Sequence, residues 1–342
     1  MTKTLKLSML LGIAAAAQSG LAHHSSIGIY DTTRLIEVEG TVTAILWRNP
    51  HPSYTLAVED ENGETVDWRI EAGSISTLRV MGIGRDFIEV GDHVTLAGEP
   101  SMRGRREMHA RNLLLEDGRE ALLSAGSNPY WSAGNPERIY QAGVDPEAAE
   151  RGRQSATGIF RVWSRVANDT DSWPLYRDNV GGLTEAAAQI RAQWDPTQSP
   201  YLGCAPKGLP YVMGSAYPME FVPRGENLLI RLEESDARRV IYMNGADAPS
   251  EYSMYGSSTG RWDGNTLIVE TQKIDTPHFY GDGTPQSRNI RLTEYFTLSE
   301  SEDRLDYRLI VDDPETFTEI REFTRYWAWR PDLSVEPYNC QP

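Results

Sequence analysis

Positive charge is scarce in this chain of 342 residues. Lysine and arginine number 33 against 49 aspartate and glutamate residues, which gives a formal net charge of -16 at pH 7. Proteins that bind nucleic acids need basic side chains to displace counterions from the phosphates. A chain this acidic is expected to repel a phosphate backbone, so we exclude nucleic acid as a partner.

Long hydrophobic runs are also lacking. The apolar run over residues 7–17 is too short for a transmembrane helix of about 20 residues, and no later segment approaches that length. Two lysines precede the run, and small residues stand at the third and first positions before His23, so we expect residues 1–22 to be a cleaved signal peptide. Cleavage after Ala17 is the alternative. Either cut predicts a periplasmic or secreted protein, presumed to come from a Gram-negative bacterium, without a transmembrane segment.

Cysteine is almost absent, since Cys204 and Cys340 are the only two. In an exported chain such a pair predicts a disulfide before it predicts a metal site or a nucleophile. The bond would fasten the last residues to the start of the second half of the chain. In the chain-entropy account, closing so long a loop stabilises by about 4 to 5 kcal/mol.

The remaining residues are expected to form two mainly β domains, because domains usually hold about 100 to 200 residues. Short alternating strands follow one another from residue 35 to 123, with a hairpin signal at Asn62-Gly63 and a short helix over 74–81. This pattern predicts a small OB-like antiparallel barrel over residues 23–124.

Residues 125–198 read as a connecting segment with short helices at 146–150 and 184–191. A C-terminal antiparallel β-barrel or curved sheet, lipocalin-like in shape, is expected over residues 199–342. Six alternating runs predict its strands: 227–233, 239–244, 265–271, 291–299, 305–312 and 318–329.

Several motifs of the N-terminal region belong together. They are Ala22-His23-His24-Ser25, Tyr30-Asp31, Gly40-Thr41-Val42, Trp47-Arg48-Asn49-Pro50-His51, Asp67-Trp68, Gly91-Asp92 and Ala110-Arg111-Asn112. On these motifs, residues 22–123 resemble an uncharacterised exported bacterial family, domain of unknown function 6152. The resemblance implies a small periplasmic β-domain and carries no activity with it.

Histidines are the candidate metal ligands. If His23 becomes residue 1, its α-amine and imidazole could bind copper together, with a further imidazole completing the site. His24, His51, His93 and His109 could supply that imidazole, and we favour His51 because the Asn-Pro-His turn lies beyond a strand end. A solvated surface imidazole is the plainer interpretation of His93 and His109. Asp67, Arg69 and Glu71 share one strand face, which we interpret as a self-neutralising solvated surface.

In the second half, a Gly-rich loop carries His278, a candidate for a catalytic base. The side chains expected around a small, partly apolar ligand near this loop are Tyr252, Tyr255, Trp262, His278, Tyr280 and Arg288. Ser258 lies in a G-x-S-x-G match, but no helix follows it, so we do not interpret it as a nucleophile.

These features favour a binding or accessory protein of the periplasm, with a metal at the N-terminal histidines and a small ligand in the C-terminal domain. Copper is the cofactor that these histidines suggest. The alternatives are a periplasmic enzyme, either a copper-dependent oxidase or a cofactor-free hydrolase or isomerase using His278, and a structural subunit that docks to an envelope protein partner.

Overall fold

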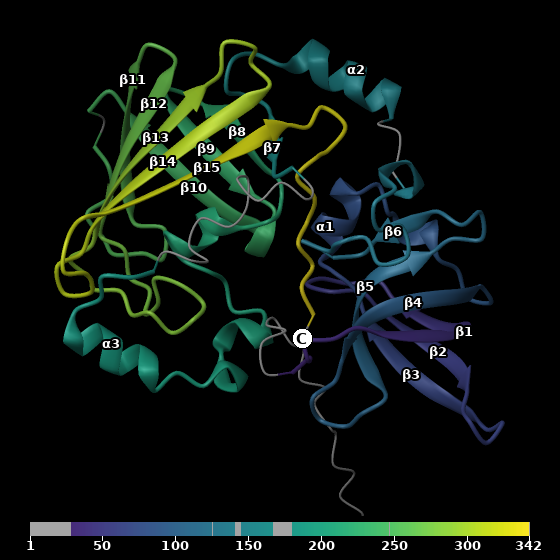
Figure 1. Cartoon of the computed structure of the whole chain (residues 1–342). Helices are drawn as coiled ribbons and strands as arrows, with labels where there is room; N and C mark the ends of the chain where they lie inside the picture. The colour runs from purple at the N-terminus through teal and green to yellow at the C-terminus, as the bar shows by residue number, and fades with distance from the viewer. Residues whose placement is uncertain (1–28, 125, 141–144, 167–179, 246, 342) are drawn as a thin grey trace, which may run out of the picture.

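Two closed β-barrels make up the computed structural model, which describes residues 29–124, 126–140, 145–166, 180–245 and 247–341 (Figure 1). The first barrel closes in the order β1-β2-β3-β5-β4, and a short strand β6 pairs with β5 outside the ring. The bounds are β1 Ile36–Leu46, β2 Ser53–Glu59, β3 Thr65–Glu71, β4 His93–Pro100, β5 Glu107–Leu114 and β6 Glu120–Leu122. The expected OB-like barrel is confirmed, with one parallel pair, β3–β5, among antiparallel ones.

Local sequence signals set the edges of this barrel. Gly63 adopts φ 78°, and the chain turns at Asn62-Gly63 between the antiparallel strands β2 and β3, as the hairpin signal predicts. Helix α1 (Ile75–Val80) begins where the Ser74 hydroxyl accepts a hydrogen bond from the Thr77 backbone N–H. Leu78 on this helix is fully buried in the barrel core. The helix, which connects β3 to β4, therefore packs against the barrel core.

The second barrel has nine strands and is also closed. Its bounds are β7 Val162–Ser164, β8 Met219–Arg224, β9 Asn227–Leu232, β10 Ala237–Met243, β11 Ser257–Asp263, β12 Thr266–Gln272, β13 Arg291–Leu298, β14 Arg304–Asp312 and β15 Arg321–Trp329. Helices α2 (Pro146–Ser155) and α3 (Glu185–Ala192) form in the connecting segment, which also contributes β7. The predicted strands are all present. The patterns did not predict three of the nine strands: β7, which is only three residues long, β8, in which Pro223 weakens the strand signal, and β11.

Large side chains fill the interior of the second barrel. Phe296, Tyr307 and Trp327 pack against one another, with ring centroids 4.9 to 6.4 Å apart. The Arg239 guanidinium and the Glu294 carboxylate form an ion pair among them, and both side chains are at most 2% exposed. The described interior of this barrel is therefore a packed core built around one buried charge pair.

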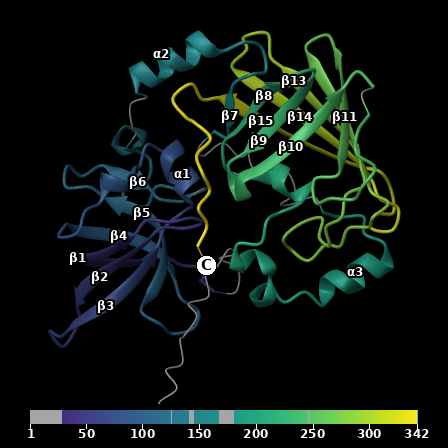
Figure 2. The same cartoon turned by 180° about the vertical axis from the view of Figure 1, so that it is seen from behind.

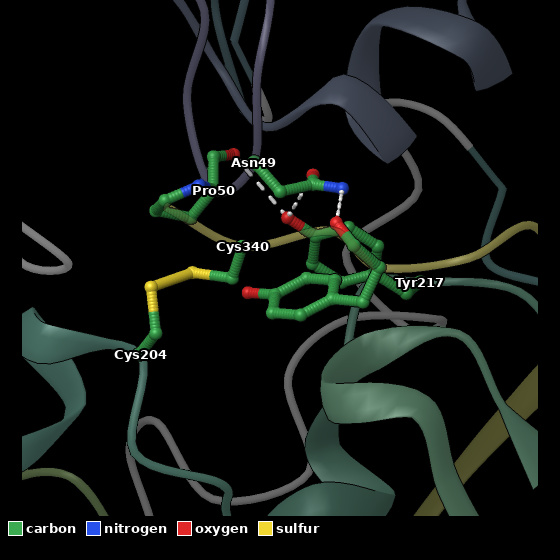
Figure 3. The surroundings of a disulfide bond; sticks show 6 residues. Asn49, Pro50, Cys204, Tyr217 and Cys340 are labelled. Atoms are coloured by element: carbon green, nitrogen blue, oxygen red, sulfur yellow. Dashed lines mark hydrogen bonds between the residues drawn. A yellow bond between two sulfur atoms is a disulfide. The ribbon is translucent and has the colours of Figure 1, made fainter. Parts of the chain in front are cut away.

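The predicted disulfide is present between Cys204 and Cys340, whose Cα atoms are 6.0 Å apart and which are separated by 136 positions in the chain (Figure 3). It anchors the C-terminal segment, residues 330–341, which leaves β15 and runs down between the two barrels (Figures 1 and 2). Among the described residues, no helix has the length and apolar character needed to cross a membrane.

Candidate functional site

The Asn-Pro-His motif forms the turn between β1 and β2 and presents His51 at the edge of the first barrel. His51 Nδ1 lies 2.9 Å from the carbonyl oxygen of Ala72, just after β3. A carbonyl can only accept, so Nδ1 carries the proton and Nε2 keeps its lone pair. The motif thereby fixes both the place and the tautomer of this imidazole.

A second histidine and a glutamate lie beside His51. In the parallel β3–β5 pair, Glu71 is in register with His109, and Glu71 Oε1 lies 3.8 Å from His109 Nδ1. The same carboxylate oxygen lies 4.0 Å from Nδ1 of His51. The rings of His51 and His109 are 6.2 Å apart between centroids and meet edge to face. The Glu71 carboxylate thus lies within 4.0 Å of both imidazoles.

His109 is the most deeply buried member of the group, at 6% exposure. Its Nε2 lies 3.0 Å from the Ser124 hydroxyl, whereas its buried Nδ1 has no hydrogen-bond partner. Almost all buried polar side-chain atoms have a partner, so an orphaned ring nitrogen needs an explanation. A lone pair that faces a carboxylate edge is one that a cation could use.

Tyr30 covers this group from the N-terminal side. Its ring centroid lies 5.7 Å from that of His109, and its hydroxyl lies 3.5 Å from Glu71 Oε2. Burial first, and then the Glu71 charge, raise the pKa of Tyr30 above its usual range, so the phenol stays neutral and donates. Burial also lowers the pKa of His51, an effect that exceeds the opposing pull of Glu71. His51 is therefore neutral near pH 7.

The other histidines are placed differently. His23 and His24 lie outside the described residues. His93 is solvent-exposed on β4, where its Nε2 lies 2.8 Å from Glu39 Oε1. Across the described ranges, no group of three or more His, Cys, Asp or Glu side chains is arranged to hold a metal ion. His51, Glu71 and His109 alone are therefore an incomplete ligand set.

Sequence reasoning placed Glu71 on a solvated face with Asp67 and Arg69. Those two are exposed as expected, but the Glu71 side chain is only 12% exposed because β5 pairs beside it at the end of β3. His109 is likewise buried and does not lie on a solvated surface. The burial of Glu71 and His109 was not predicted because it depends on the β3–β5 pair, which joins two segments that no local sequence pattern connects.

Two of the predicted ligand residues of the C-terminal domain, His278 and Tyr280, lie close to each other on the β12–β13 loop. His278 packs against Trp194, with ring centroids 4.8 Å apart, and its Nδ1 lies 3.4 Å from the Tyr201 hydroxyl. The Tyr201 ring packs edge to face against Tyr211, and Tyr211 packs in the same way against Tyr280, with ring centroids 5.1 Å apart in both pairs. Burial lowers the pKa of His278. In the described part of the chain no recorded ion pair joins it to a carboxylate.

The remaining predicted residues of this domain spread further apart. Arg288 stacks on the exposed Tyr252 ring at 4.2 Å, and Tyr255 is half-buried against the barrel core. Trp262 lies near the C-terminal end of β11, about 17 Å along the strand from Ser257, the first residue of β11. Ser258 is buried, and its hydroxyl accepts hydrogen bonds from Arg239, so it is not placed as a nucleophile.

Comparison with known families bears on the first barrel. Residues 11–110 match the model of DUF6152, a family of unknown function. The match includes Asn49, His51, Glu71 and His109, and it confirms the resemblance seen in the motifs. The DUF6152 region ends before Ser124 and before the second barrel. Comparison with curated proteins gives no match.

Proposed function

We propose that this is an exported metal-binding protein whose first barrel holds a transition-metal ion between His51, His109 and the mature N-terminus. The orphaned, buried Nδ1 of His109 beside Glu71 carries this proposal. Metal ligation would satisfy that nitrogen, and Glu71 would offset the positive charge of the ion.

The surroundings of both imidazoles suit ligation. A ligating imidazole must be neutral and is normally oriented through its other nitrogen by a carbonyl, hydroxyl or carboxylate. Ala72 fills that role at Nδ1 of His51, and Ser124 fills it at Nε2 of His109. The two free nitrogens are thus Nε2 of His51 and Nδ1 of His109.

The missing ligands can come from the N-terminus. Described structure begins at Ile29, and Tyr30 already touches His109 and Glu71. Five residues lie between His23 and Ile29, and the six Cα-to-Cα steps span up to about 20 Å when extended. Cleavage before His23 would supply an amine and an imidazole within reach. Nitrogen ligands, with the Glu71 carboxylate beside them, favour copper(II) over the other common divalent ions.

Three variants of the mature protein test this proposal after mass spectrometry has defined its first residue. We expect copper(II), titrated by calorimetry with nitrogen hyperfine structure followed by EPR, to bind the wild type tightly. His51→Ala and an added Gly-Ser before His23 should each weaken binding more than about 100-fold, beyond the loss typical of outer-shell changes. His93→Ala, which removes an exposed imidazole, is the matched control. Equal affinity in all four proteins would refute the proposal.

A second function, the binding of a small aromatic or partly apolar molecule, is favoured by the rings around His278. Because the barrel interior is packed, this ligand would lie against the β12–β13 loop. Aromatic walls with a neutral imidazole suit a planar ligand that bears a hydroxyl. A library of phenols screened by ligand-observed NMR should show contacts that Trp194→Ala abolishes and Trp262→Ala leaves unchanged. The absence of any such difference would count against this site.

A further inference from the structure

We propose that the C-terminal segment, residues 330–341, is a strap that positions His51, with Asn49 and Tyr217 as the positioning residues and the Cys204–Cys340 disulfide as its lock. This inference deepens the proposed metal site and rests on it for the readout in metal affinity. Its structural part concerns only the strap and the turn that the strap holds.

The strap is bound on its way down between the barrels. The Arg79 guanidinium on α1 donates to the carbonyl of Ser334 at 3.0 Å and pairs with Glu233 of the second domain. Glu233 accepts in turn from the backbone N–H of Glu336 at 3.0 Å. One guanidinium and one buried carboxylate therefore tie both domains to the strap.

The turn Glu234–Asp236 is shaped for this contact. Ser235 and Asp236 have φ of 61° and 50°, and two successive non-glycine residues in the left-handed region are uncommon. Asp236 accepts a hydrogen bond from the backbone N–H of Tyr338 at 3.1 Å. The strained turn is thus held in place where it receives the strap.

The end of the strap lies on the Asn-Pro-His turn (Figure 3). The Asn49 side-chain amide donates to the carbonyl of Tyr338, and the backbone N–H of Gln341 donates to the carbonyl of Asn49 at 3.3 Å. The Tyr217 hydroxyl lies 3.3 Å from Asn49 Oδ1 and 3.2 Å from the carbonyl of Pro50. The next residue is His51, so these bonds fix the backbone that carries the imidazole.

The disulfide closes the arrangement. Cys340 pairs with Asn49 in a parallel bridge and is bonded to Cys204 at the end of the turn Pro200–Gly203. Both cysteines are half-exposed, so a dithiol reductant can reach them. Reduction would pass two electrons and two protons from the dithiol to the two sulfurs and leave the donor as a disulfide. Loss of the bond frees the strap end and loosens the turn, so metal affinity would follow the thiol–disulfide state.

Amide hydrogen exchange and copper(II) titration together test the strap in the full mature chain. We expect amide exchange at residues 51, 53 and 54 to be faster by at least about fivefold in Tyr217→Phe, Asn49→Ala and the Cys204→Ser/Cys340→Ser double variant, since each loses a hydrogen bond or the disulfide. Copper affinity should fall at least tenfold in the same variants. Tyr307→Phe removes a buried phenol hydroxyl from the second barrel and is the matched control.

The outcomes separate the two claims. If exchange is faster in the variants but the wild type binds no copper, the strap is supported and the metal site is refuted. Copper binding and exchange that are the same in Tyr217→Phe and the wild type would refute the strap and leave the metal site. Tyr217→Phe keeps its ring against Tyr338, so it decides the matter even where the double variant fails to fold.

Discussion

Glu71 and His109 face each other across the one parallel strand pair of the first barrel, with Glu71 Oε1 3.8 Å from His109 Nδ1. Closure of the barrel alone creates this relationship, because β3 and β5 are separated in the chain by α1 and β4. A half-buried carboxylate between two imidazoles attracts a cation more strongly than an exposed one, since water screens it less.

Neutralising Glu71 should therefore weaken metal binding. We expect Glu71→Gln to lower copper(II) affinity by about 10- to 100-fold, the usual effect of removing a charge or orienting group beside the ligands. Asp67→Asn is the control, because Asp67 lies on the same face of β3 but is exposed. Calorimetric titration of the two variants side by side gives the comparison. Equal losses would show that general surface charge, and not the position of Glu71, attracts the ion.

His51 makes the stability of the metal-free protein depend on pH. Burial lowers its pKa in the folded state, and among its neighbours His109 and Lys207 lower it further while Glu71 raises it. The unfolded chain then binds a proton more readily than the folded one, so stability should be full above about pH 6.5 and fall as the pH drops below that value. Urea unfolding at pH 7.5 and pH 5 should show a smaller difference for His51→Gln than for the wild type. An unchanged difference would mean that other groups cause the acid sensitivity.

Sequence patterns sufficed for features that depend on local or alternating order. The two barrels, the Asn62-Gly63 hairpin and the Cys204–Cys340 bond were all predicted, since each follows from strand periodicity, turn chemistry or cysteine count. The burial of Glu71 and His109 was not predicted. Their environment comes from a parallel pairing whose register no run of residues encodes, and the OB-like order of strands would have had to be assumed to find it.

The contact between the domains was equally hidden. Arg79 and Glu233 stand 154 positions apart, in α1 and directly after β9, and no sequence pattern connects them. Asn49 resembled a turn former and proved to hold the C-terminal segment. Long-range partners of this kind follow from how two finished barrels dock, which is settled by shape and charge across the whole interface.

Gly98 permits the close approach of β4 to β5 that orients His109. A Cβ at this position would lie 2.4 Å from the carbonyl oxygen of His109, beside the irregularity in the register at Ala97 and Gly98. We expect Gly98→Ala to lower the free energy of unfolding by about 1 to 3 kcal/mol, as overpacking does. Gly84→Ala meets nothing within 4 Å and should be neutral or slightly stabilising. Chemical denaturation measures both variants, and equal stability would contradict the close approach.

The ion pair inside the second barrel lies in a fully bonded network. Arg239 donates to Glu294 and to the Ser258 and Thr271 hydroxyls, and the Tyr307 hydroxyl donates to Glu294 at 2.8 Å. The Glu294 side chain has no exposed surface, so water cannot replace a lost partner. Removing one charge should therefore cost much more than removing both.

Arg239→Met leaves the Glu294 charge buried without its cation, and we expect the free energy of unfolding to fall by about 3 to 5 kcal/mol. The double variant Arg239→Met/Glu294→Gln should recover a large part of that loss, because the isolated charge is gone. Arg304→Met breaks the pair with Asp306, whose side chains are 51% and 46% exposed, and should change stability by less than about 1 kcal/mol. Guanidinium denaturation of the three variants gives the comparison. If Arg239→Met were no more damaging than Arg304→Met, the interior of the barrel would have to admit water to Glu294, and the packed core would be wrong.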